Sequence, residues 1–202
     1  MARTLLSLFI MTACLSISAQ NFKGGLSLGL NGSQVDGDGL AGFRKIGITG
    51  GLYLQYPVSD LVDVQLEILY SPLGSLDRFR ISGLRSSYID FPLLVNFHLP
   101  LEVWDEKEVL NLEGGVSFGY LLVATSPDRF TDLTDAYRQV DTRFMLGVVV
   151  DLGEKTHLGL RYARSLYSIL RGGRLGVDCF RGLGLCNEYV NLVLRYDLIG
   201  SD

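Results

Sequence analysis

The C-terminal segment "YVNLVLRYDL", residues 189–198, alternates between apolar and polar side chains. Its even-numbered residues are all apolar or aromatic, from Val190 to Leu198, whereas its odd-numbered residues include Asn191 and Arg195. Because neighbouring side chains of a β-strand point to opposite faces, this pattern predicts a strand with one apolar and one polar face. The pattern leaves open which face meets the surroundings, and that choice separates a membrane barrel from a soluble sheet.

The same alternation recurs in seven earlier segments, which gives eight predicted strands in total. The earlier segments are residues 22–31, 46–58, 62–70, 89–99, 110–122, 144–152 and 157–162. None of the apolar series contains a charge over the roughly 9–11 residues that a tilted strand needs to cross a bilayer. A Lys or Arg on the lipid face near the bilayer centre costs about 2–4 kcal/mol. The uncharged series therefore favour strands that face hydrocarbon.

The connections between these segments alternate in length. Residues 57–62 and 151–156 form short connections, and residues 98–108 form an intermediate one. The other connections are long and rich in Gly, Ser, Asp and Arg, and they comprise residues 31–44, 71–86, 125–141 and 166–188. Short turns at one end and long loops at the other are typical of outer-membrane barrels, whose long loops are extracellular.

The polar series and the aromatic residues also favour the membrane interpretation. The polar face is rich in small residues such as Gly29, Gly51 and Ser117, which suit the narrow, side-chain-filled interior of an eight-stranded barrel. The aromatic residues gather at strand ends, as in the two girdles of a membrane barrel. They are Phe22, Tyr56, Phe97, Trp104 and Tyr196 at the periplasmic end and Tyr70, Phe118, Tyr120, Phe144 and Tyr162 toward the other. We therefore predict an all-β fold, an eight-stranded antiparallel up-and-down transmembrane β-barrel.

The N-terminus has the pattern of a secretory signal peptide. Arg3 provides a basic start, residues 5–11 are apolar but too short to span a bilayer, and a small-residue cleavage site ends at Ala19. This predicts a signal peptide over residues 1–19 and a barrel domain over residues 20–202. A second interpretation takes "MTAC" as a lipidation motif with Cys14 as the modified residue.

Two cysteines remain after the predicted cleavage, Cys179 and Cys186 in "CFRGLGLC". Export places the chain in an oxidising compartment, where nearby cysteines pair, and the intervening glycines allow the loop to turn back. We predict a disulfide between them, with two free thiols as the alternative. A metal site is not expected, because two ligands without a nearby His are too few.

The polar series also carries charges of both signs, which must be paired if the polar face is buried. Glu67, Glu113, Arg161 and Arg195 are expected near mid-height, as a central ionic cluster. Lys23 at the start of the first strand and Asp197 at the end of the last are expected to pair at the periplasmic rim. Such a cluster fits a solid polar plug, and the alternative is a path for ions or protons.

Catalysis is not expected. Both histidines, His98 and His157, lie on the polar series near the periplasmic end, and Ser117 is inward as well, so no Ser–His pair faces the lipid rim where a lipid-modifying barrel would need it. No phosphate-binding, dinucleotide-binding or zinc motif is present, so no cofactor is predicted. The net charge of −4 argues against nucleic acid as a partner.

The long loops are the other candidate site. Residues 71–86 and 166–188 are rich in arginine, whereas residues 125–141 are acidic, with Asp141 among the acids. Guanidinium groups suit phosphates, so the arginine-rich loops are candidate binding sites for lipopolysaccharide or an acidic partner. The arginines concerned are Arg78, Arg80, Arg85, Arg171, Arg174 and Arg181. The alternative is ordinary solvated loops that balance each other's charge.

Several motifs together resemble one family. "GGLSLGLNGSQVDGDG", "KIGITGGLYLQYPVSDLVDVQLEILYSPLG", "YIDFPLLVNF", "DTRFMLGVVVDL" and "LGLRYARSLYSI" are similar in order and spacing to the PorT-like outer-membrane β-barrel family of Bacteroidetes. The resemblance covers nearly the whole mature chain. It departs at the C-terminus, which reads "DLIGSD" where many such barrels end on an aromatic residue, and at the cysteine pair, which is not part of the family pattern. The resemblance implies an integral outer-membrane protein and does not imply catalysis. Some members of the family assist a secretion system, and many have no defined activity.

From these observations we predict an integral outer-membrane protein that scaffolds or binds partners through its extracellular loops, in contact with outer-membrane lipid and lipopolysaccharide. Secretion- or assembly-complex proteins are the expected protein partners. One alternative is a narrow porin-like channel. Another is a soluble secreted barrel that binds a ligand.

Overall fold

The structure is a computed structural model that describes residues 22–40, 42–79, 82–103, 106–126, 131–171, 179–182 and 184–200. The predicted signal peptide, Cys14 and Trp104 lie outside the described residues. Within the described ranges, no helix is long and apolar enough to span a membrane.

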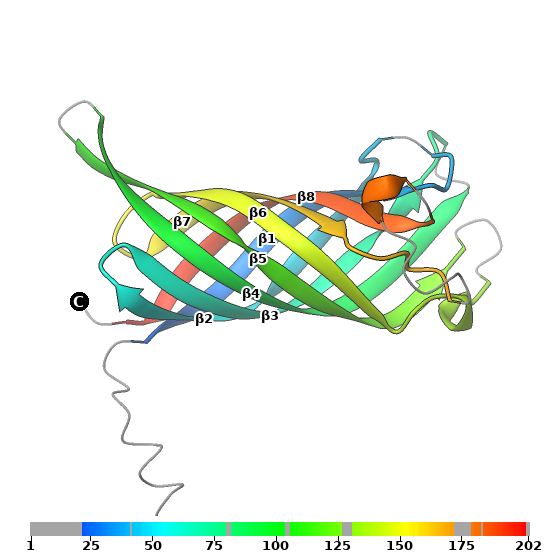
Figure 1. Cartoon of the computed structure of the whole chain (residues 1–202), viewed down its shortest axis with the longest axis horizontal. Coiled ribbons are helices and arrows are strands. Elements are labelled where there is room, and N and C mark those ends of the chain that lie inside the picture. Colours follow the sequence, from blue (N-terminus) through cyan, green and yellow to red (C-terminus); the bar gives the residue numbers. More distant parts are fainter. Residues whose placement is uncertain are drawn as a thin grey trace, which may run out of the picture.

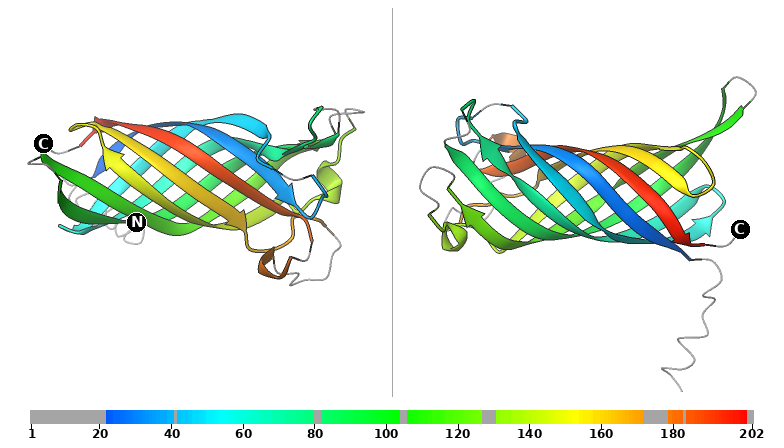
Figure 2. Two further views of the ribbon diagram at one scale, coloured as in Figure 1. Left: turned by 90° about the horizontal axis from the view of Figure 1, so that it is seen from above. Right: turned by 180° about the vertical axis from the view of Figure 1, so that it is seen from behind.

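The chain forms one closed barrel of eight strands (Figures 1 and 2). The strands are β1 (Lys23–Asp36), β2 (Lys45–Ser59), β3 (Val62–Leu76), β4 (Gly83–Val103), β5 (Glu106–Thr125), β6 (Val140–Asp151), β7 (Thr156–Ser165) and β8 (Cys186–Ile199). Each strand pairs antiparallel with its sequence neighbours, and β1 pairs with β8 to close the sheet. The predicted up-and-down barrel is confirmed. Both described chain ends lie at the end with the short turns, which is periplasmic in outer-membrane barrels (Figure 1).

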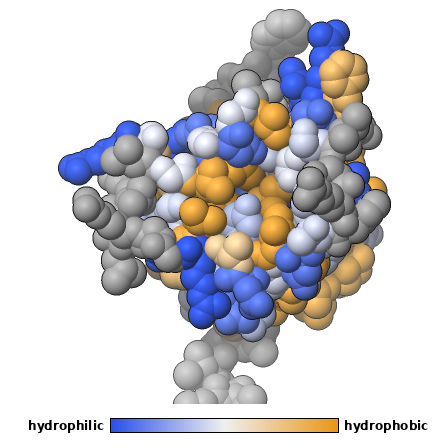
Figure 3. Space-filling view, turned by 90° about the vertical axis from the view of Figure 1, so that its right-hand side faces the viewer, coloured by the Kyte–Doolittle hydropathy of each residue, from blue (hydrophilic) through white to orange (hydrophobic). Residues whose placement is uncertain are grey.

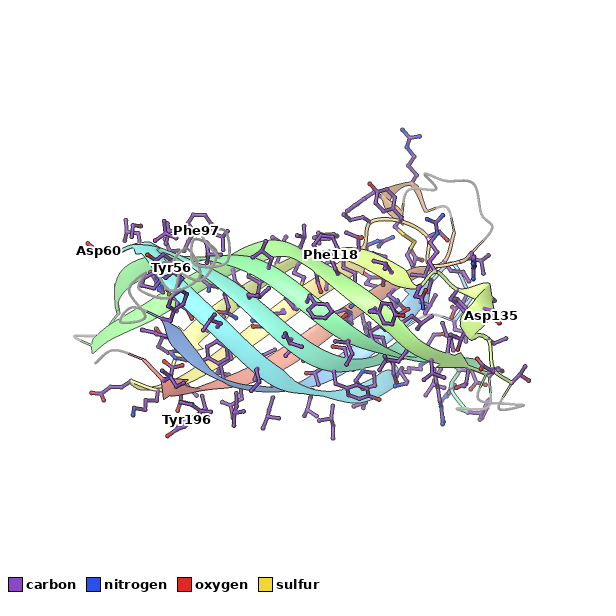
Figure 4. All side chains as sticks on the ribbon, turned by 90° about the horizontal axis from the view of Figure 1, so that it is seen from below. Tyr56, Asp60, Phe97, Phe118, Asp135 and Tyr196 are labelled. Atoms are coloured by element: carbon purple, nitrogen blue, oxygen red, sulfur yellow. A yellow bond between two sulfur atoms is a disulfide. The ribbon has the colours of Figure 1, made fainter. Side chains whose placement is uncertain are left out.

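The barrel is apolar outside and polar inside. On β1, Leu28 is 57% exposed and Leu30 is 54% exposed, whereas Ser27 and Asn31 are almost fully buried. The aromatic residues follow the same rule, and Figure 4 shows Tyr56, Phe97 and Tyr196 on the outer wall near the periplasmic end, with Phe118 farther along the barrel. In water this arrangement would expose a continuous apolar belt, so hydrocarbon is the medium that the exterior fits.

Inward glycines let adjacent strands approach closely. A Cβ on Gly51 would lie 1.9 Å from the carbonyl oxygen of Ile68, and one on Gly115 would lie 2.1 Å from that of Leu93. Neither distance leaves room for a methyl group. The small residues of the polar series are thus a packing requirement of this narrow barrel.

The strands extend beyond the predicted segments. Residues 31–36 and 71–76, predicted as loop, belong to β1 and β3, and most of residues 98–108 is strand and not a connection. The pairing of β4 with β5 continues to Val103 and Glu106, past their pairing with β3 and β6, so a two-stranded ribbon projects at the periplasmic end (Figure 1). The alternation of apolar and polar residues is lost there because water contacts both faces of a strand outside the bilayer.

An apolar cluster fills the extracellular end of the interior, where the sequence predicted a polar face. Ile169, from the β7–β8 loop, is 1% exposed and packs among inward residues of several strands. The buried members are Val35, Leu73, Leu84, Tyr88, Leu94, Leu121, Ala124, Met145, Ala163, Ile169 and Tyr189. Figure 3, which views this end, shows apolar side chains at its centre with polar residues around them.

Two short 3-10 helices lie in the extracellular loops. Helix η2 (Thr134–Ala136) follows β5, and the loop folds back on that strand through a bond from the Leu133 amide to the Ala124 carbonyl, at 2.8 Å. Helix η3 (Cys179–Arg181) precedes β8. The β7–β8 loop is tied to the β5–β6 loop by a bond from the Arg138 amide to the Ile169 carbonyl, at 2.7 Å. These bonds hold the two loops over the apolar cluster.

Candidate functional site

The structure brings the four predicted mid-height charges together. Arg161 on β7 donates from Nη1 and Nη2 to the two carboxylate oxygens of Glu67, both at 2.7 Å, and from Nε and Nη2 to Glu113. Arg195 on β8 donates to Glu113 Oε2 at 3.3 Å. All four residues are at most 4% exposed. Two arginines balance two glutamates, so this central ionic cluster carries no net charge.

Neutral residues complete the central ionic cluster. The Gln65 amide donates to Glu67 and its carbonyl oxygen accepts from Arg195, while Asn96 donates to the same oxygen at 3.0 Å. Gln65 and Asn96 were not predicted as members, because the prediction considered only charged side chains and these two carry neutral amides. Their contribution is to satisfy carboxylate and guanidinium atoms that the opposite charges leave open.

A second ionic cluster lies closer to the extracellular end. Arg143 on β6 donates to Asp90 at 3.0 Å and to Asp141 at 2.7 Å, and its guanidinium lies 4.7 Å from the centre of the Tyr88 ring. Asn187 also donates to Asp141, at 2.9 Å. The sequence placed Asp141 in an acidic loop. It is instead the second residue of β6, with its side chain buried inside the barrel.

A ring of hydrogen bonds closes the periplasmic end of the interior. Each of the strands from β2 to β8 contributes at least one member, and we call this ring the histidine belt. Its members are Tyr53, Gln55, Asp63, His98, Asn111, Asp151, His157 and Asp197. The ring starts with Gln55, which donates to Asp63, and returns to β2 through Tyr53, which donates to Asp197. No single motif predicts this ring, since each strand contributes only one or two members.

His98 and His157 are the bridges of the histidine belt. His98 joins Asp63 and the Asn111 carbonyl oxygen, each at 2.5 Å. His157 joins Asp151 at 2.5 Å and Asp197 at 3.2 Å. The two histidines therefore link acidic and amide side chains of different strands.

The structure gives Asp197 partners other than the predicted rim partner Lys23. Within the described residues no ion pair joins them, and Asp197 is bound by Tyr53 and His157 instead. In the β1–β8 pairing, Asp197 lies opposite Gly25 and Ile199 lies opposite Gly24. Lys23 is consequently carried past the level of Asp197.

A pocket of about 660 Å³ opens at the periplasmic mouth. Its lining includes Lys23 and four members of the histidine belt, Gln55, Asp63, His98 and Asp151. Among the described residues, no group of three or more His, Cys, Asp or Glu side chains has the arrangement of a metal site.

The positions of Ser117 and the histidines offer no nucleophile–base pair. Ser117 pairs with Pro92 and Arg143 across the sheet, at the height of the second ionic cluster. His98 is six residues farther along β4 than Pro92, a separation of about 20 Å at the usual strand rise. The hydroxyl and the imidazole therefore lie at different heights of the barrel.

The predicted disulfide is confirmed: Cys179 and Cys186 are bonded, with a Cα–Cα distance of 6.0 Å. It joins η3 to the first residue of β8.

The predicted arginine sites are brought together only in part. Arg78 and Arg85 are exposed beside the β3–β4 loop, and Arg171 and Arg181 are exposed in the β7–β8 loop. Arg80 and Arg174 lie outside the described residues. The structure shows these side chains on two separate loops at the extracellular end.

The β5–β6 loop is ordered by its own polar groups. Hydrogen bonds from Thr134 lower the pKa of the exposed Asp132 carboxyl, which caps the start of η2. Burial and the neighbouring charge of Asp38 raise the pKa of Tyr137.

Comparisons with known proteins agree with this geometry. Residues 4–179 match the model of the outer membrane protein beta-barrel domain family. No curated protein matches the chain at a significant level. The solved structure of Neisserial surface protein A is similar, with a TM-score of 0.52 and 8% identity, over 88% of this chain and 97% of that one.

Two further structures match with lower TM-scores. Ail, the attachment invasion locus protein of Yersinia pestis, solved with the heparin analogue sucrose octasulfate, gives a TM-score of 0.48 and 14% identity, over 89% of this chain and 100% of that one. The N-terminal barrel of OprF from Pseudomonas aeruginosa gives 0.41 and 12%, over 89% and 98%. Since the family model covers 176 of the 202 residues (4 through 179), the chain belongs to the outer membrane protein β-barrel domain family and is an integral outer-membrane protein.

Proposed function

We propose that this chain is a non-catalytic outer-membrane protein that scaffolds or binds partners through its extracellular loops, as an accessory subunit of a secretion or assembly complex. The observation that carries the proposal is the filled interior. From the periplasmic end upward, the histidine belt, the central ionic cluster, the Arg143 cluster and the apolar cluster occupy successive heights. Such an interior favours a barrel plugged by its own side chains over a porin-like channel. The extracellular loops are then the part of the molecule that remains available to a partner.

The soluble alternative fits the structure poorly. A secreted ligand-binding barrel would keep its apolar face inside, whereas here the apolar residues of the strands are outside and the charges are within. The resemblance to the PorT-like family of Bacteroidetes supports the accessory role, and the export route that we propose is cleavage of residues 1–19 as a signal peptide. Mass spectrometry of the purified protein tests the route, because cleavage leaves Gln20 as the first residue, whereas lipidation would leave Cys14.

The loops also support an anionic partner. Arg78 lies in the turn of the β3–β4 hairpin and Arg85 lies on β4, and Arg171 and Arg181 add exposed guanidinium groups in the β7–β8 loop. Exposed guanidinium groups bind phosphate or carboxylate in a bidentate manner. We propose lipopolysaccharide phosphates or an acidic protein surface as their ligand.

A pull-down from native membranes in mild detergent tests the proposed function. The bait is the full chain with a periplasmic-end tag, compared with Arg78→Glu/Arg85→Glu and with the control Asp60→Lys at the exposed β2–β3 turn. We expect recurring outer-membrane proteins with the wild type and the control, and their loss with the loop variant. Folding of each bait is checked by its heat-dependent shift in gel mobility. Absence of recurring proteins, or an unchanged set with the folded loop variant, would contradict the accessory role.

A further inference from the structure

Helix η3 lies against the outer wall of the barrel and not over its mouth. The ring of Phe180 packs on Phe144 of β6 with 5.3 Å between ring centres, and Phe144 packs on Tyr162 of β7 at 5.7 Å. Phe144 and Tyr162 belong to the outward series of their strands, together with the lipid-facing Leu146 and Leu160. Figures 1 and 2 both show the turn beside the barrel wall at the extracellular end.

Phe180 remains 61% exposed although one face of its ring is covered. The exposed face continues the apolar exterior of β6 and β7, since the ring rests on a residue of that surface. Aromatic rings at this height form the girdle of a membrane barrel, where the body of the ring meets acyl chains. The loop therefore adds an aromatic residue to a surface that is already in contact with lipid.

Several bonds fix the position of the turn. Cys179 is fully buried and is joined through its disulfide to Cys186 at the start of β8. Its backbone amide donates to the Leu166 carbonyl at 3.2 Å, and its own carbonyl accepts from Arg164 Nη2 at 2.9 Å. Arg164 in turn donates to Asp36 of β1 at 2.6 Å. The turn is thus bonded to β7 and β8, and through Arg164 it is linked to β1. These bonds restrict its movement away from the barrel wall into water.

The polar groups around the turn mark the height of the lipid headgroups. Arg164, Asp36 and Glu188 lie on the outward series of their strands but are charged, so they cannot lie in hydrocarbon. Phe180 contacts Phe144, which lies directly opposite Arg164 of this polar collar in the β6–β7 pairing. This boundary between charges and apolar side chains is where an aromatic anchor is stable.

We propose that η3 is a disulfide-clamped membrane anchor that places the Phe180 ring in the outer-leaflet lipid, at the boundary between headgroups and acyl chains. The occupant of this surface is lipid, because the surface is continuous with the lipid-facing wall and is bordered by the polar collar. The anchor is independent of the partner-binding role proposed above. Its effect is to hold the β7–β8 loop down on the membrane and to fix the orientation of that loop.

Tryptophan fluorescence tests the anchor in the full-length barrel. Trp104 is the single native tryptophan, so Phe180→Trp is placed in a Trp104→Phe background and reconstituted in phosphatidylcholine bilayers. The quenchers are bromine on the acyl chains near the headgroup and iodide in the aqueous phase. Leu192→Trp on the outer face of β8 provides the lipid control, and Asp135→Trp in η2, at the far extracellular end in Figure 4, provides the aqueous control.

We expect Phe180→Trp to show blue-shifted emission and strong quenching by the brominated lipid, like Leu192→Trp, with little quenching by iodide. Iodide quenching like that of Asp135→Trp would overturn the proposal. Protection from both quenchers would also overturn it, since it would indicate that a protein surface or a second copy covers the ring.

The clamp is tested in the same background with Cys179→Ser and Cys186→Ser. The gel-mobility shift confirms that the barrel is folded. We expect loss of the lipid quenching and a rise in the iodide quenching, because the turn is released from β8. Unchanged lipid quenching in the folded variant would show that the disulfide does not hold the anchor in place.

Discussion

Replacement of Arg161 by Met is the sharpest test of how this barrel is stabilised. Arg161 is 1% exposed and donates four hydrogen bonds to two buried carboxylates. Methionine keeps much of the apolar stem but removes the guanidinium. Glu113 then retains Arg195, whereas Glu67 loses its main cationic partner. Removal of one partner of a buried ion pair typically costs about 3–5 kcal/mol, and we expect the free energy of unfolding to fall by that amount.

A second substitution separates charge balance from lost packing. Adding Glu67→Gln to Arg161→Met leaves one glutamate and one arginine, so the cluster is neutral again. Because replacing both members of a buried pair is far less harmful than removing one, the double variant should regain at least about 1 kcal/mol over the single one. Arg44→Met, at an exposed loop arginine, is the matched control and should change the stability by less than about 0.5 kcal/mol.

The measurement is equilibrium unfolding by denaturant in phospholipid micelles, followed by the fluorescence of the native tryptophan and by gel mobility. Two results would refute the reasoning. One is a loss for Arg161→Met no larger than the roughly 1 kcal/mol of an exposed ion pair. The other is a double variant that is no more stable than the single one, since that would mean that the unpaired charge on Glu67 is not what destabilises the barrel.

Three further predictions concern other parts of the interior. His157→Phe should lower the free energy of unfolding, because it removes the two ring nitrogens that join Asp151 to Asp197; an unchanged stability would contradict the belt geometry. Gly51→Ala should destabilise the barrel by about 1–3 kcal/mol or prevent its assembly, because its methyl group would collide with the neighbouring strand. Gly153→Ala, with no atom within 4 Å of the added Cβ, should be tolerated in the same unfolding assay. Purified protein in planar bilayers should give no steady current, and a stable ion current would remove the plug interpretation.

The sequence alone was sufficient to predict the fold and to predict the face of the barrel on which the charged residues of the central ionic cluster lie. Alternation has the period of a strand, and lipid excludes charge from one face, so the pattern assigns Glu67, Glu113, Arg161 and Arg195 to the interior. The disulfide between Cys179 and Cys186 was also predictable, because the two cysteines are close in sequence and the chain is exported.

The partners of those charges were decided by the tertiary structure. Alternation fixes a face but not a height, and height depends on the stagger between strands. In the β1–β8 pairing, Lys23 lies beyond the level of Asp197, which is opposite Gly25. The stagger also brought Asp90 of β4 to Arg143 of β6 and aligned residues of seven strands into the histidine belt.

The ends of the strands and the apolar cluster at the extracellular mouth were likewise beyond the reach of the sequence pattern. Lipid imposes the alternation only over the thickness of the hydrocarbon, so a strand that continues into water carries no comparable signal. The loops that cover the mouth bring apolar residues such as Ile169 against inward side chains from distant strands. Lipid restricts the outward residues of each strand, and the fold can therefore be predicted from the sequence. The contacts inside the barrel depend on the register of the closed sheet, which the alternation does not determine.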